Sequence, residues 1–132
     1  MDLEDFGFDE VGQWRLRASV KSGVTFRLDR YQNDRVIYAF VVDGNPKYVG
    51  ICDKSTTTLK DRMSRYRGRV GGSTNKRIAD AIRGALQRGA TVKILALRPH
   101  DSIQYRGLHI DLVKGLENPL LEAVDPDWNV HK

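Results

Sequence analysis

The apolar residues in the first half of the chain fall in short runs separated by turn residues, a pattern typical of β-strands. Residues 13–20 alternate weakly between apolar and polar, and a glycine-containing turn separates them from a second run at 25–31. Residues 36–42 give a stronger strand pattern. The segment Asp43-Gly44-Asn45-Pro46 then has the composition of a tight turn before an antiparallel partner strand at 47–52. The pattern therefore predicts two hairpins.

The spacing of apolar residues changes to that of helices after the polar segment DKSTTT, which offers a threonine as a helix cap. Leu59, Met63 and Tyr66 predict a helix at 59–67, and the segment RGRVGGST ends it. Ser73 or Thr74 is expected to cap a second helix that runs to about residue 88 and stops at Gly89. Its buried stripe is expected to consist of Ile78, Ile82, Ala85 and Leu86.

The last third of the chain predicts one more strand and one more helix. Residues 91–97 read as a strand bounded by Arg98-Pro99, and a loop carrying His100 and His109 follows. A last helix lies within residues 112–124, because Pro126 disfavours helix at the residue before it. The order of elements predicts an α+β fold: a small antiparallel sheet of three central strands, extended by the N-terminal hairpin and flanked by about three helices.

Length and composition suit one soluble domain over residues 1–132, since 40% of the residues are hydrophobic and 30% are charged. No apolar run approaches the roughly 20 residues of a membrane helix, and the acidic N-terminus lacks the regions of a signal peptide. A single cysteine, Cys52, excludes an internal disulfide. The histidines show no zinc-ligand spacing. We therefore expect a cytoplasmic protein without a membrane partner and without structural zinc.

The positive charge of the chain is concentrated in one stretch. The net charge is +5, but the first ten residues hold five acids and no base. Between residues 54 and 98 there are twelve bases and only two acids, Asp61 and Asp80. Such a one-sided excess favours a polyanionic partner, most simply nucleic acid. The residues expected to contact DNA lie in and around the glycine-rich segment that joins the two helices: Arg65, Arg67, Arg69, Asn75, Lys76 and Arg77.

Several residues that are unremarkable alone form an ordered set. Tyr38 and Tyr48 lie on the two strands of one hairpin, and Arg62 and Tyr66 share one face of the next helix. Glu117 stands near the start of the last helix, because Pro119 is tolerated best in a first turn and the helix dipole favours a carboxylate there. Taken singly, a solvated arginine, packed tyrosines and an ordinary helix start would explain them.

Together these residues resemble the GIY-YIG nuclease family over residues 36–129. VIY stands for the first motif, YVG for the second, and LKDRMSRY resembles the helix that carries the family arginine. LENPLLEAVDPDWN resembles the stretch from the family glutamate to its asparagine, with a spacing like that of the nuclease subunit of bacterial excision repair. Val36 departs from the family glycine, Ile51 replaces a frequent lysine, and the loop at 53–58 is longer. Residues 1–35 form an N-terminal extension outside the resemblance.

The resemblance implies a DNA endonuclease that uses one divalent ion, Mg²⁺ or Mn²⁺. It implies that Glu117 holds the ion, that Arg62 binds the scissile phosphate and that Tyr38 orients the attacking water. Tyr48 and Tyr66 would place water and phosphate, and Asn129 would anchor the chain end beside the site. Tyr38 and Tyr48 share a face of the sheet only if the residue numbers of each cross-strand pair add to an even number. This hypothesis therefore predicts an odd-length loop, Gly44-Asn45-Pro46.

Two alternatives use the same residues differently. A non-catalytic nucleic-acid-binding domain would keep the fold and the basic stretch, and it would bind with a steep salt dependence without cleavage. A plain structural domain would explain the core but not the charge. Within the nuclease hypothesis, cutting at a defined sequence would require a homodimer, the first 35 residues or a partner protein.

Overall fold

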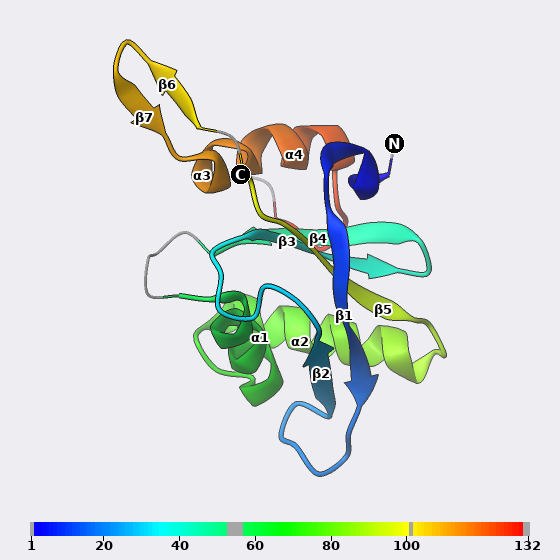
Figure 1. The fold of residues 1–132 in the computed structure, drawn as a ribbon. Helices are drawn as coiled ribbons and strands as arrows, with labels where there is room; N and C mark the ends of the chain where they lie inside the picture. Colours follow the sequence, from blue (N-terminus) through cyan, green and yellow to red (C-terminus); the bar gives the residue numbers. More distant parts are fainter. Residues whose placement is uncertain (1, 53–56, 101, 131–132) are drawn as a thin grey trace.

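The computed structural model describes residues 2–52, 57–100 and 102–130 and is built on one five-stranded antiparallel sheet (Figure 1). The strands stand in the order β2-β1-β5-β3-β4. Their bounds are β1 (Asp9–Leu16), β2 (Val24–Leu28), β3 (Ile37–Val42), β4 (Asn45–Ile51) and β5 (Val92–Leu97). The N-terminal hairpin extends the central three strands because β1 pairs with β5, which confirms the predicted α+β fold. No helix in the described part of the chain is long and apolar enough to cross a membrane.

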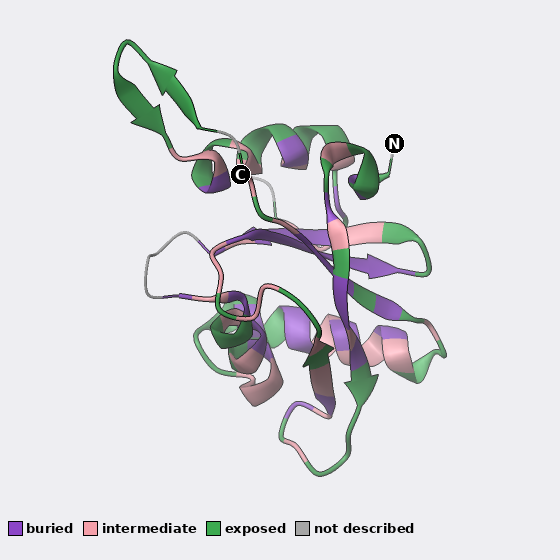
Figure 2. Cartoon of the chain, viewed as in Figure 1, coloured by how far each residue is buried: buried purple, intermediate pink, exposed green. Residues whose placement is uncertain are grey.

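The sheet is covered on both faces, so its inner strand β3, between β5 and β4, is buried at every position. Helices α1 (Leu59–Gly68) and α2 (Ser73–Gln87) pack on one face, where Met63 and Ile82 meet Phe40. The short helix η1 (Leu3–Phe6) and the helices α3 (Leu112–Gly115) and α4 (Glu117–Val124) cover the other face (Figures 1 and 2). A fully apolar run is what a strand buried on both faces requires.

The helix ends follow the sequence signals with one exception. Thr58 caps α1 in a reciprocal box, since its hydroxyl accepts from the Asp61 backbone and the Asp61 carboxylate accepts from the Thr58 backbone. Gly89 has a φ of +85° and ends α2, as expected. The predicted cap of α2 at Ser73 or Thr74 was wrong, because the N-cap is Gly72. Its φ of +116°, which favours glycine, turns the chain sharply into the helix.

The turn between β3 and β4 differs from the odd-length loop predicted. Asp43 and Gly44, with φ of 48° and 84°, form a two-residue turn that pairs Val42 with Asn45. The register then shifts between Phe40 and Val41, and Lys47 is the additional residue of a bulge. Pro46 precedes the bulge on an edge strand, where a residue without a backbone N–H is tolerated. The bulge restores an even register, so Tyr38 and Tyr48 do share a face.

The segment after β5 was predicted as a loop and is instead a second hairpin. Strands β6 (Ile103–Tyr105) and β7 (Leu108–Ile110) are joined by Arg106 and Gly107, both with positive φ. Apolar alternation around an X-Gly turn was the available signal. The predicted single last helix is also two helices, with Leu116 closing α3 and opening α4.

Candidate active site

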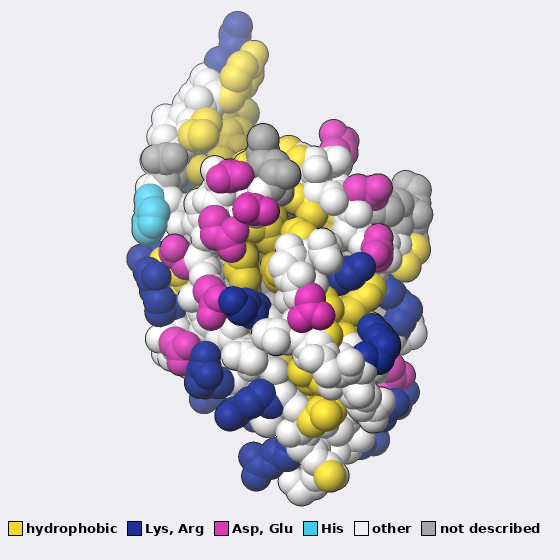
Figure 3. Space-filling view, turned by 90° about the vertical axis from the view of Figure 1, so that its right-hand side faces the viewer, with side chains coloured by type: hydrophobic (Ala, Val, Ile, Leu, Met, Phe, Trp, Pro, Cys, Tyr) yellow, Lys and Arg dark blue, Asp and Glu magenta, His cyan; other side chains and the backbone are white. Residues whose placement is uncertain are grey.

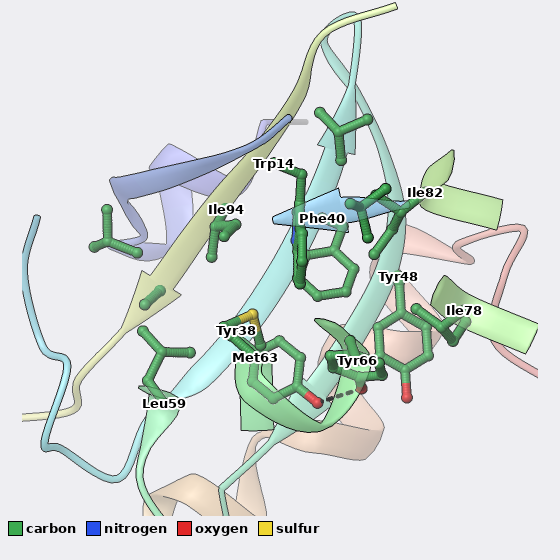
Figure 4. Packing of buried hydrophobic residues seen from close by; sticks show 14 of the residues in the cluster. Trp14, Tyr38, Phe40, Tyr48, Leu59, Met63, Tyr66, Ile78, Ile82 and Ile94 are labelled. Carbon is green, nitrogen blue, oxygen red and sulfur yellow. Dashed lines mark hydrogen bonds between the residues drawn. The ribbon is translucent and has the colours of Figure 1, made fainter. Parts of the chain in front are cut away.

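Four aromatic rings from three elements meet on the face of the sheet that α1 covers (Figure 4). Tyr38 and Phe40 are two residues apart on β3 and therefore lie on the same face of the sheet. Tyr48 on β4 stacks against Phe40 at 5.8 Å between ring centroids. Tyr66 of α1 closes the group, 6.4 Å from the Tyr38 ring and 6.5 Å from the Tyr48 ring. Figure 4 shows the three tyrosine hydroxyls at one end of this cluster. The aromatic cluster thus presents its polar atoms together.

Arg62 joins the hydroxyl end of the aromatic cluster. The hydroxyls of Tyr38 and Tyr66 are hydrogen-bonded at 2.7 Å. One turn before Tyr66 on α1, the Arg62 Nη2 donates to the Tyr38 hydroxyl at 3.3 Å and to the Tyr66 hydroxyl at 3.5 Å. Arg62 is half-buried, so its guanidinium lies between the buried tyrosines and solvent. Because these contacts are long, the guanidinium can still donate hydrogen bonds to a charged group such as phosphate, which it binds more strongly than a hydroxyl.

Burial controls the protonation of the tyrosines. Burial, followed by the neighbouring Tyr48 hydroxyl, raises the pKa of Tyr38 well above its usual range, despite the opposing charge of Arg62. Burial also raises the pKa of Tyr48 and of Tyr66. All three hydroxyls are therefore neutral near pH 7 and can orient a water or a phosphate without acting as phenolates. Tyr38 and Tyr66 have no exposed surface, whereas Tyr48 is 8% exposed.

Glu117 lies on the helix that packs against the other face of the sheet. It is the first residue of α4 and is half-buried. Helix α4 packs against β4, the edge strand that carries Tyr48, so the helix with the carboxylate and the aromatic cluster meet at one strand. Within residues 2–52, 57–100 and 102–130 there is no group of three or more His, Cys, Asp or Glu side chains able to hold a metal ion.

Asn129 fixes the end of the chain to β4 beside Tyr48. Its side-chain oxygen accepts from the Val49 N–H and its amide donates to the Val49 carbonyl, both at 2.9 Å. The Trp128 N–H donates to the Lys47 carbonyl at 2.7 Å, and Arg77 of α2 donates to the Trp128 carbonyl. The tail therefore holds the edge strand at the residues that flank Tyr48.

The residues expected to contact DNA divide into two groups. Arg65, Lys76 and Arg77 are exposed, and Arg77 also donates to the Trp128 carbonyl. Arg67 and Arg69 are half-buried and have partners within the protein: Arg69 pairs with Asp80 through two hydrogen bonds of 3.0 Å, and Arg67 lies 4.9 Å from the Phe26 ring centroid.

Asn75 differs most from its predicted role in contacting DNA. It is only 4% exposed, and its amide donates to the Val70 carbonyl at 2.9 Å. This contact closes the glycine-rich segment between α1 and α2, so we assign Asn75 to holding that segment instead of to DNA. The signal that could have shown its burial was helical spacing, because Asn75 lies three residues before Ile78 and seven before Ile82 on the buried stripe of α2.

Sequence reasoning missed Gly50 as a contributor to the site. Gly50 lies directly opposite Tyr38 in the sheet. A Cβ at this position would stand 2.5 Å from both the Cζ and the hydroxyl oxygen of Tyr38. Only glycine leaves room for the tyrosine ring in its present place, and the cross-strand register was the information needed to find this.

Comparison with known proteins identifies the fold. No protein-family model and no curated protein matches the chain. A mutant of bacteriophage T4 EndoII matches with a TM-score of 0.72 and 20% identity over 96% of this chain and 95% of that one. Restriction endonuclease HPY188I in complex with product DNA matches with a TM-score of 0.56 and 19% identity over 93% of this chain and 79% of that one. At these identities the likeness shows a shared fold, and the activity has to be argued from the site.

Proposed function

We propose that the chain is a metal-dependent DNA endonuclease of the GIY-YIG type. The observation that carries the proposal is the contact of Arg62 with the hydroxyls of Tyr38 and Tyr66 at the end of the aromatic cluster. The hydroxyls of Tyr38 and Tyr66 already bond each other, so the half-buried guanidinium is not needed to satisfy them and can serve a ligand on its solvent side. The likeness to a restriction endonuclease bound to its product DNA supports the same conclusion.

The chemistry follows from what each side chain can do. Arg62 is always charged and would bind two oxygens of the scissile phosphate, which neutralises the charge that develops there. Tyr48 is the tyrosine that reaches the surface, so burial favours it over Tyr38 for orienting the attacking water. Tyr38 and Tyr66 would then hold Arg62 and the phosphate in line. Asn129 would keep β4, and with it Tyr48, in place.

Glu117 is the residue we propose to hold a divalent ion, Mg²⁺ or Mn²⁺. A single carboxylate at a helix start fits an ion that keeps most of its water and takes further oxygens from phosphate, as Mg²⁺ prefers. Such an ion, when bound, would stabilise negative charge on the phosphate and the leaving oxygen. No cluster of ligands within the described residues suggests a dedicated all-protein cage.

Nicking of supercoiled plasmid tests the proposal, with Mg²⁺, Mn²⁺ or EDTA present. We expect metal-dependent nicking that Glu117→Gln abolishes. Glu122→Gln is the matched control, since Glu122 is an exposed glutamate of the same helix and should leave the rate unchanged. Equal nicking by the wild type and Glu117→Gln would remove Glu117 from the mechanism.

The alternative function is a non-catalytic DNA-binding domain, which the exposed bases Arg65 and Lys76 would also serve. It predicts salt-sensitive DNA binding with no nicking under any metal condition. Binding with intact salt dependence but without cleavage would favour this alternative.

A further inference from the structure

The hairpin formed by β6 and β7 carries an apolar face that is largely exposed to solvent. Ile103 pairs with Ile110 and Tyr105 pairs with Leu108, so all four side chains lie on the same face of the two strands. They are 47%, 37%, 63% and 67% exposed in that order. Gln104 and His109 occupy the opposite face. Figures 1 and 2 show the hairpin projecting from the body of the molecule and exposed along its length.

This arrangement is unusual for a surface hairpin. A two-stranded hairpin without a third element to pack on is at best marginally stable in water. Its apolar residues are contiguous, unlike the single exposed apolar side chains that any surface carries. An exposed face of this kind marks a surface that another molecule covers.

A second apolar surface of the same chain is suited to receive the hairpin. It is a cavity of about 160 Å³ where η1, the end of β5 and α4 meet, lined by Phe6, Leu97, Leu116, Pro119, Leu120 and Ala123. The hairpin of the same molecule extends away from α4 (Figure 1), and none of residues 103–110 is among those that line the cavity.

The charges around the two surfaces are complementary. Arg106, at the tip of the hairpin, is the only charged residue between positions 103 and 110, counting histidine as neutral. The elements η1 and α4 contain four acids and no base: Glu4, Asp5, Glu117 and Glu122. On the face seen in Figure 3, acidic side chains surround the upper part of the body below the hairpin, whereas acidic and basic side chains are mixed farther down. A basic tip would therefore meet an acidic rim.

We propose that two copies of the chain associate by exchanging their β6–β7 hairpins, each apolar face covering the partner's cavity. An exchange about a two-fold axis uses the same pair of surfaces twice and leaves neither exposed. DNA is the weaker candidate for this face, because apolar side chains and a single base lack the positive charge that binds phosphates. The inference does not depend on the proposed nuclease activity.

Sedimentation velocity of the full chain tests the proposal, at roughly 1 to 100 µM. The wild type should be a dimer that dissociates on dilution. The hairpin variant Tyr105→Arg/Leu108→Arg and the cavity variant Ala123→Arg should each raise the dissociation constant about 30-fold or more. Leu16→Arg is the control, since Leu16 is 50% exposed at the end of β1 and outside both surfaces. Unchanged far-UV circular dichroism shows that each variant is folded.

Mixing the two variants gives the decisive result. Each lacks one of the two surfaces, so a mixture should form a heterodimer through the one intact hairpin and the one intact cavity. A monomeric wild type at all concentrations would overturn the proposal. So would a hairpin variant that still dimerises, or a mixture that stays monomeric. Loss of DNA binding in the hairpin variant, with no change in mass, would assign the hairpin to DNA instead.

Discussion

Gly50→Ala should damage the site although it replaces none of the site's polar residues. The added Cβ would stand 2.5 Å from the Cζ and the hydroxyl oxygen of Tyr38. Unstrained carbon contacts begin near 3.5 Å, so the tyrosine ring would have to move by roughly 1 Å. Tyr38 has no exposed surface and packs against Phe40, Tyr48 and Tyr66, so no free space lies beside it.

The expected magnitudes follow from that displacement. Overpacking of a well-packed core costs about 1–3 kcal/mol of unfolding free energy. A shift of about 1 Å in a group that positions the reacting atoms costs on the order of 10²-fold in rate. Urea unfolding measures the first effect and single-turnover plasmid nicking measures the second.

Gly84→Ala is the matched control for Gly50→Ala. Gly84 lies inside α2, and an added Cβ would meet only the end of the flexible Arg88 side chain at 3.4 Å. We expect a gain of up to about 1 kcal/mol, since alanine is the better helix former. In a Tyr38→Ala background, the stability cost of Gly50→Ala should largely disappear, because the two residues are in contact. If Gly50→Ala had the unfolding free energy and the nicking rate of the wild type, the close approach of residue 50 to the Tyr38 ring would be refuted.

Three further predictions concern protonation, the tail and the glycine-rich segment. Burial raises the pKa of each clustered tyrosine, so the tyrosines of the unfolded chain ionise at lower pH than those of the folded chain. The free energy of unfolding, measured with urea, should therefore be constant below about pH 10 and fall above it by about 1.4 kcal/mol per pH unit per tyrosine. The decrease should be less steep in Tyr66→Phe, which has one tyrosine fewer. Asn129→Ala should cost about 1–3 kcal/mol through two lost hydrogen bonds, against no change in the exposed control Asn118→Ala. Asn75→Ala should lower the free energy of unfolding by about 1 kcal/mol and leave the salt dependence of DNA binding unchanged. Lys76→Ala should reduce the slope of log affinity against log salt concentration by about one. An equal slope in both variants would contradict these assignments.

The fold could be predicted where the burial of a strand or helix requires a regular spacing of apolar residues. The apolar run of β3 and the stripe of α2 are required by packing on the sheet, and both were found. The β6–β7 hairpin was missed because its alternation spans only eight residues and turns at Arg106-Gly107, a weaker turn signal than Asn-Gly. The N-terminal strand was predicted about four residues too late, because its pairing with β5 extends it back to Asp9.

The site was predictable in its residue types but not in its register. Helical spacing in α1 placed Arg62 and Tyr66 on one face, and only the resemblance to a nuclease family predicted that Tyr38 would lie beside them. The bulge at Lys47 was not predictable, since it depends on how Pro46 and the two-residue turn share the edge of the sheet. The role of Gly50 follows only from that register. The burial of Asn75 depends on a single carbonyl, that of Val70, which becomes its partner only after the segment has folded.

The attachment of the C-terminal tail also protects the sheet from other chains. Strand β4 is an edge, and an edge strand offers unpaired N–H and C=O groups to any extended peptide. Here Asn129 occupies both backbone groups of Val49, and Trp128 occupies the carbonyl of Lys47. These two residues, through three hydrogen bonds, thereby take the place of a sixth strand without forming one. Proteolytic removal of the tail would leave an adhesive edge, and aggregation would accompany any loss of activity.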